Sequence, residues 1–243
     1  MKRRERLIAT LRGEPVDRPA VSFYEIGGGR ADPGNPDPFN IFNSLDWRPL
    51  LQLAEEQTDR ILMRGPATRA VDGEARNEFF RTEMTDRDGS RFTRTTVTIA
   101  GRTLTSLRRR DRDVNTVWTL EHLLKDADDV RAYLELPDEV FAQTHDVTPL
   151  IEAEEQLGDD GIVMVDTADP ICIAADLFSM ENYTVFALTE PGLFHSLLEK
   201  AARQILPKVE YVAREFPGRL WRIYGSEYAS EPYLPPRLYE EYV

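Results

Sequence analysis

The sequence predicts an α/β fold built on a parallel sheet. Short apolar runs alternate with helical patterns along the chain, which is typical of parallel βαβ units. The run IVMV at 162–165 is apolar throughout, as in strands that are covered on both faces. With 243 residues and 41% hydrophobic content, the chain is long enough to bury a large core. We expect core strands at 20–25, 60–64, 161–166 and 220–224.

The N-terminal part is expected to form a helix, a strand and a loop. Apolar residues recur at helical spacing within 4–12, and Gly13 ends that pattern. Pro19 disfavours a helix before it, which predicts the strand at 20–25. The segment 27–38 is rich in glycine, proline and Asx residues, so it is expected to be a loop. It lacks the G-x-G-x-x-G spacing of a dinucleotide site.

The middle of the chain changes character. Asp46 is placed to cap a helix before the strand at 60–64. From 76 to 107 the pattern becomes rich in β-branched and aromatic residues, and Asp88-Gly89 and Ala100-Gly101 interrupt it. Such dipeptides between β-rich runs predict antiparallel hairpins, here inserted into the α/β architecture.

Helical patterns return in the C-terminal part. Helices are expected after Asp126, at 147–157, at 191–215 and at 235–243. The chain ends inside the last of these patterns without a glycine cap. We therefore expect residues 1–243 to be a single domain that is incomplete at its C-terminus.

Composition excludes several function classes. The formal net charge of −13 disfavours nucleic-acid binding, and no apolar run is long enough to predict a membrane span. The single cysteine, Cys172, rules out an internal disulfide framework and predicts a cytoplasmic protein. The arginine-rich run at 108–112 alternates with aspartates. It fits a paired, solvated surface, with an anion site as the alternative.

Four segments, in order along the chain, carry a resemblance to a known family. They are residues 4–21, 116–137, 168–195 and 224–243. Together they resemble the uroporphyrinogen decarboxylase-like superfamily. The resemblance implies a (β/α)8 TIM barrel, of which this chain is the N-terminal portion, with the antiparallel β-hairpin region inserted into it.

The resemblance implies one of two chemistries. One branch decarboxylates uroporphyrinogen without a cofactor, and it carries an arginine-rich segment after the first strand. The matching stretch here, 23–30, holds one arginine, Arg30, and adds Glu25. We therefore expect the other branch, which transfers methyl groups between a methylated small molecule, a corrinoid protein and an acceptor activated by zinc. Decarboxylation of uroporphyrinogen or another carboxylated substrate is the alternative, and a non-catalytic half-barrel that dimerises as a scaffold is a third.

The barrel fold implies that chemistry lies at the carboxyl ends of the strands. The residues expected there act as catalytic groups, substrate-binding groups or a metal ligand. The catalytic candidates are Glu25, Asp166, Asp169, Tyr224 and Tyr228. The substrate-binding candidates are Arg30 and Arg64, and the metal candidate is Glu227.

Several of these candidates also have a structural interpretation. Asp169 before Pro170 is a good helix N-cap, although Asp166 and Asp169 could also share a proton or a metal. Glu227 is either a zinc ligand, an acid or base held by its tyrosine neighbours, or an ordinary loop residue. Cys172 is expected to be a small buried side chain. The family implies that the main zinc ligands lie beyond residue 243.

Overall fold

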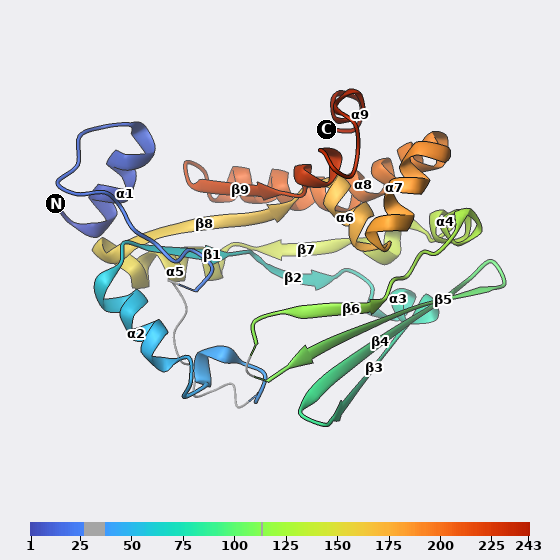
Figure 1. The fold of residues 1–243 in the computed structure, drawn as a ribbon, viewed down its shortest axis with the longest axis horizontal. Coiled ribbons are helices and arrows are strands. Elements are labelled where there is room, and N and C mark those ends of the chain that lie inside the picture. The colour runs from blue at the N-terminus through green and yellow to red at the C-terminus, as the bar shows by residue number, and fades with distance from the viewer. Residues whose placement is uncertain (27–36, 113) are drawn as a thin grey trace.

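A parallel sheet lies at the centre of the computed structural model, which describes residues 1–26, 37–112 and 114–243 (Figure 1). Its strands are β1 (Arg60–Arg64), β8 (Gly161–Ala168) and β9 (Leu220–Tyr224), paired in the order β1-β8-β9. The predicted α/β class and three of the four predicted core strands are therefore confirmed. The strands of the described residues do not close into a barrel.

The strand predicted at 20–25 is wrong. Residues 19–23 have no regular secondary structure, and 24–26 form a turn. The main chain of Val21 does meet the residue before β1, because Asp59 N–H donates to the Val21 carbonyl at 2.7 Å. The Val21 N–H, however, donates to the Asp59 side chain at 3.0 Å. The Asp59 side chain thus occupies the Val21 N–H that a β-ladder would need, so this segment does not pair with β1 as a strand.

The predicted hairpins form an antiparallel sheet beside the parallel one. Its strands, in spatial order, are β3 (Phe80–Arg87), β4 (Ser90–Ile99), β5 (Arg102–Asp111) and β6 (Val117–Glu121). The sheet begins and ends later than the predicted 76–107, because α3 (Gly73–Phe79) precedes it and β6 extends it. Asp88 and Ala100 adopt positive φ of 52° beside Gly89 and Gly101, as tight hairpin turns require.

A short ribbon between the two sheets was not expected. It pairs β2 (Ala67–Ala70) with β7 (Gln143–Asp146) in antiparallel register. Neither strand has an alternating apolar pattern, and β2 is exposed throughout. The hydropathy pattern therefore carries no signal for this pairing.

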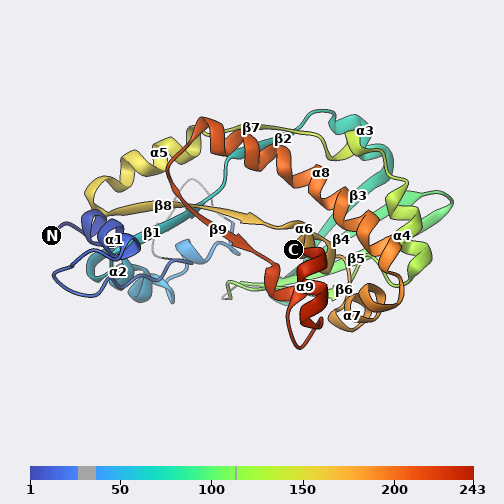
Figure 2. The same ribbon diagram turned by 90° about the horizontal axis from the view of Figure 1, so that it is seen from above.

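Helices cover the parallel sheet and fill the space beside it. Figure 2 shows α5 and α8 together on one side of the parallel strands. The helices are α1 (Arg3–Arg12), α2 (Arg48–Gln57), α4 (Ala127–Leu134), α5 (Thr148–Leu157), α6 (Pro170–Asp176), α7 (Met180–Thr189), α8 (Pro191–Glu215) and α9 (Pro236–Tyr242). Asp126 caps α4 as expected, whereas α2 begins after Trp47 and Asp46 does not cap it.

Two hydrophobic clusters hold these layers together. The smaller one joins α5, β8 and the end of α8 through Leu150, Val163 and Val212. The larger one packs α4, α6, α7 and the start of α8 against the antiparallel sheet, where Val97 and Leu104 are buried. In the described part of the chain, no single helix is long and apolar enough to cross a bilayer. The α6 and α7 pair passes that test only jointly, and it is bent by 119°.

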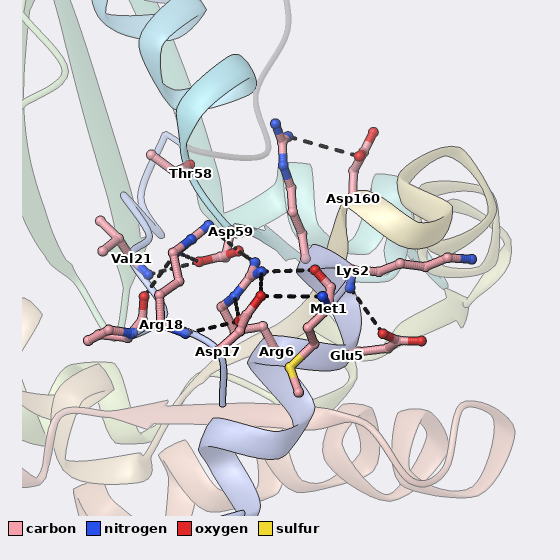
Figure 3. A network of polar contacts seen from close by, with 12 residues as sticks. Met1, Lys2, Glu5, Arg6, Asp17, Arg18, Val21, Thr58, Asp59 and Asp160 are labelled. Atoms are coloured by element: carbon pink, nitrogen blue, oxygen red, sulfur yellow. Dashed lines mark hydrogen bonds and ion pairs between the residues drawn. The ribbon is translucent and has the colours of Figure 1, made fainter. Parts of the chain in front are cut away.

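A buried ionic network ties the N-terminal segment to the start of β1 (Figure 3). Asp59 has no exposed surface, and its carboxylate accepts bonds from Arg6 at 2.7 Å and from Arg18 at 2.7 and 3.0 Å. Arg6 also binds both carboxylate oxygens of Asp17, at 2.6 and 2.7 Å. Burial raises the pKa of Asp59, but the bonds from Arg18, Val21 and Arg6 outweigh burial, so its pKa lies below the ordinary value.

Replacing Asp59 tests this network. We expect Asp59→Ala to lower the free energy of unfolding by about 3 kcal/mol or more, because the buried Arg6 loses one of its two carboxylate partners and the Val21 N–H loses its acceptor. Urea denaturation measures the change. The matched control is Asp160→Ala, since Asp160 is exposed and its ion pair with Arg3 is long, at 3.9 Å. We expect this variant to change the free energy of unfolding by no more than about 0.5 kcal/mol. Equal losses in the two variants would contradict the role of Asp59.

Candidate functional site

The carboxyl ends of β8 and β9 meet at Gly225. Its φ of 123° lies in a region that favours glycine. A Cβ at this position would lie 2.2 Å from the Cys172 Cβ and 2.4 Å from Asp169 Oδ1. The Asp169 N–H also donates to the Tyr224 carbonyl at 3.0 Å. The missing side chain therefore lets the end of β9 contact the start of α6 directly.

Two carboxylates converge at this glycine. Asp169 Oδ1 accepts the Cys172 N–H at 2.8 Å and caps α6, which confirms the predicted cap. Glu227 Oε2 accepts the Gly225 N–H at 2.8 Å. Burial raises the pKa of Asp169, the bond from Cys172 opposes this, and the charge of Glu227 adds to the increase. Asp169 is thus a capping residue whose carboxyl group also holds its proton more tightly than usual.

Tyr224 and Tyr228 are neighbours of Glu227 in the chain, but in the described structure their hydroxyls do not hold its carboxylate. The main chain of Tyr228 donates to the Gly225 carbonyl at 2.9 Å and accepts the Tyr183 hydroxyl at 3.0 Å. Burial raises the pKa of both Tyr224 and Tyr228. Among the described residues, neither hydroxyl bonds to Glu227, so the expected support from these tyrosines is wrong. The main-chain N–H of Gly225 supports Glu227 instead.

Asp166 does not join this pair. Its position in β8 stands opposite Arg222 in β9, and the two side chains form two hydrogen bonds, at 2.5 and 3.0 Å. The Arg222 guanidinium also lies 5.0 Å from the centre of the Tyr224 ring and 5.5 Å from that of Tyr24. The alternative in which Asp166 and Asp169 share a proton or a metal is therefore not favoured, because the strand register gives Asp166 a cationic partner of its own.

The remaining predicted residues lie apart from Gly225. Glu25 is exposed in the 24–26 turn and lines a separate cavity with Trp47. Arg64 is exposed at the end of β1. Arg30 lies outside the described residues. The structure thus brings together Asp169, Tyr224, Glu227 and Tyr228 of the predicted set.

Cys172 and the arginine run at 108–112 have structural roles. Burial raises the pKa of the half-buried Cys172 thiol to about 12, and the charge of Asp169 adds to the shift. The thiol is therefore protonated at neutral pH. Arg108 pairs with Asp176, and Arg109 lies 3.4 Å from Asp111 and over the Trp118 ring. Arg108 and Arg109 are thus paired as predicted, whereas the Nε atoms of Arg109 and Arg110 are buried without a hydrogen-bond partner among the described residues.

The described side chains do not form a metal centre. In residues 1–26, 37–112 and 114–243, no three His, Cys, Asp or Glu side chains gather closely enough to hold a metal ion. Two important residues escaped the sequence analysis. Gly225 carried a signal, since a glycine directly follows an apolar strand, but Arg222 inside that strand carried none.

Comparison with known proteins adds no family. No family model, curated protein or solved structure matches the chain. The superfamily resemblance therefore stays a prediction carried by the four sequence segments.

Adding a methyl group at Gly225 tests the close approach of β9 and α6. We expect Gly225→Ala to cost about 1–3 kcal/mol more than Gly218→Ala, because overpacking adds to the backbone strain. Gly218 is a matched control, since its φ of 72° is also positive but nothing lies within 4 Å of an added Cβ. Thermal or urea unfolding measures both variants. Equal losses of stability in the two variants would show that Cys172 and Asp169 move aside for the added methyl group at no cost.

The raised pKa of Asp169 predicts the direction in which the stability of the fold changes with pH. A folded-state pKa above the unfolded value of about 3.9 means that wild-type stability falls as pH rises from that value through the folded pKa. Asp169→Asn keeps a capping side chain and removes the titration. The stability of the variant relative to wild type should therefore increase from pH 4 to pH 8. Asp126→Asn, at the cap of α4, is the control for exchanging a capping aspartate for asparagine.

Proposed function

We propose that this chain forms part of a (β/α) barrel enzyme of the uroporphyrinogen decarboxylase-like superfamily, and that it catalyses methyl transfer. The carboxyl ends of β8 and β9 form the catalytic edge. The convergence of Asp169 and Glu227 at Gly225 is the observation that carries this proposal. Its substrate is a methylated small molecule, and a thiol is the final acceptor.

The carboxylate pair acts as the proton acceptor of the reaction. As the sulfur of the thiol forms its bond to the methyl carbon, the bond between that carbon and the donor atom breaks, and its electron pair stays on the donor. The thiol proton passes to the Asp169–Glu227 pair. A neighbouring negative charge and partial burial strengthen a carboxylate as a base, and both act on Asp169. General-base catalysis of this kind contributes about 10²–10⁴ in rate.

The charge around the catalytic edge supports methyl transfer over the decarboxylation of a polyanion. A substrate with many carboxylates needs free cations to bind it. Arg222 is occupied by Asp166, and Arg108 by Asp176. Asp169 and Glu227 add negative charge at the centre of the edge. Among the described arginines near the strand ends, the exposed Arg64 is the one left to meet such a substrate.

Zinc and the corrinoid remain part of the proposal without a step of their own. The described residues do not supply three metal donors, so they do not fit a zinc site by themselves. Glu227 is the one ligand that the resemblance assigns to these residues, and if zinc took it, Asp169 would accept the proton alone. A corrinoid on a partner protein would carry the methyl group between donor and acceptor.

Methyl transfer can be assayed directly on the full-length protein. Methylcobalamin serves as the donor and 2-mercaptoethanol as the acceptor, with zinc present, and mass spectrometry detects the methylated thiol. We expect Asp169→Asn and Glu227→Gln each to lower the rate by about 10²-fold or more, because each removes a carboxylate of the pair. Asp126→Asn, which changes a helix cap elsewhere, should keep the wild-type rate.

Other outcomes would overturn the proposal. Release of CO₂ from a carboxylated substrate, with no methylated thiol formed, would favour the decarboxylase alternative. Neither product, together with a stable homodimer in solution, would favour the scaffold. Full activity in both carboxylate variants would remove Asp169 and Glu227 from the mechanism.

A further inference from the structure

A cavity of about 580 Å³ opens between the 22–26 segment and the 114–116 turn. Three aromatic residues line it, namely Phe23, Tyr24 and Trp47. Phe23 and Tyr24 are 40% and 41% exposed. Cavities of about 300–1,000 Å³ are the usual size for small-molecule sites.

Among the described residues that line the cavity, one is charged, and its charge is negative. Glu25 lines it, and in the described part of the chain this exposed carboxylate has no hydrogen-bond or ion-pair partner. No arginine or lysine belongs to the described lining. The other polar groups are uncharged, and the hydroxyl of Ser22 is buried without a partner among the described residues. The cavity is therefore suited to a cation.

The aromatic lining specifies which kind of cation. A metal ion or a small ammonium ion needs several oxygen ligands, whereas a methylated ammonium group is bound by ring faces that replace its weak hydration. Three rings and one carboxylate form the combination that binds quaternary ammonium ligands.

The cavity is connected to the catalytic edge through side chains. Tyr24 contacts Arg222, which binds Asp166 in β8 and lies 5.0 Å from the Tyr224 ring. Tyr224 directly precedes Gly225, where the two catalytic carboxylates meet. Tyr24, in the lining of this cavity, is thus linked to the end of β9 through Arg222 and Tyr224.

We infer that this cavity binds the methylated ammonium group of the substrate, an inference that rests on the proposed methyl transfer. The substrate is then a quaternary alkylammonium compound. On transfer, its C–N bond breaks, the electron pair stays on nitrogen, and a neutral tertiary amine leaves. The positive charge that Glu25 and the rings stabilise is lost in the product, which favours release.

Binding can be measured without turnover. The probes are choline and its uncharged carbon isostere, in which a tert-butyl group replaces the trimethylammonium group, and titration calorimetry on the full-length protein gives both affinities. We expect choline to bind at least about tenfold more tightly than the isostere, as a cation–π site of about 1.4 kcal/mol requires.

Glu25→Gln and Phe23→Leu should each weaken choline binding by about three- to tenfold. Phe23→Tyr keeps a ring and should bind normally, and Glu74→Gln, on α3, is the charge control.

The outcomes separate this inference from the proposed function. Equal affinity for the isostere, no choline binding, or unchanged binding in Glu25→Gln would overturn the cation site, whatever the result of the methyl-transfer assay. Choline binding that depends on Glu25 supports the site even if that assay finds no methylated thiol. In that case the failure belongs to the proposed reaction alone.

Discussion

A carboxylate without exposed surface needs cationic partners, and Asp59 takes its partners from two arginines far away in the sequence. Arg6 comes from α1, and Arg18 comes from the segment that leads toward the cavity (Figure 3). The Asp59 side chain also takes the N–H of Val21. One buried group therefore fixes α1, the chain around Val21 and the start of β1 relative to one another. Each later feature of the N-terminal region depends on this arrangement.

The position of the 22–26 segment follows from this anchor. The Asp59 carboxylate accepts the Val21 N–H. The chain around Val21 therefore makes one main-chain hydrogen bond beside β1 and does not form a strand. The residues that follow turn beside Trp47 and bring Tyr24 to Arg222. A continuous strand would have pointed Tyr24 and Glu25 to opposite faces of the sheet. Loss of the strand is thus what allows both side chains to line one cavity.

Elements with a local pattern could be predicted from the sequence, whereas contacts with a partner distant in the chain could not. The strand at 162–165 is apolar throughout, and the cap at Asp169 depends on the next three residues, so both could be predicted. The residues around Asp166 in the sequence look the same whether it is a catalytic group or the partner of an arginine. Only its register opposite Arg222 decides that it forms an ion pair. The convergence at Gly225 likewise needs two segments more than fifty residues apart. The opening residues suggested a family, which stays a prediction; the structure shows that Arg6, Asp17 and Arg18 among them all belong to the buried network.

Arg222 has a further consequence for the electrostatics of the catalytic edge. Three carboxylates at the ends of two neighbouring strands would repel one another if all were unpaired. Arg222 neutralises Asp166 and leaves Asp169 and Glu227 as the pair whose charges interact. The same guanidinium contacts the Tyr24 ring, so the group that isolates the carboxylate pair also fixes one wall of the aromatic cavity. A single ion pair between β8 and β9 thus sets Asp166 apart from the proposed base and also contacts the cavity that we propose for the substrate.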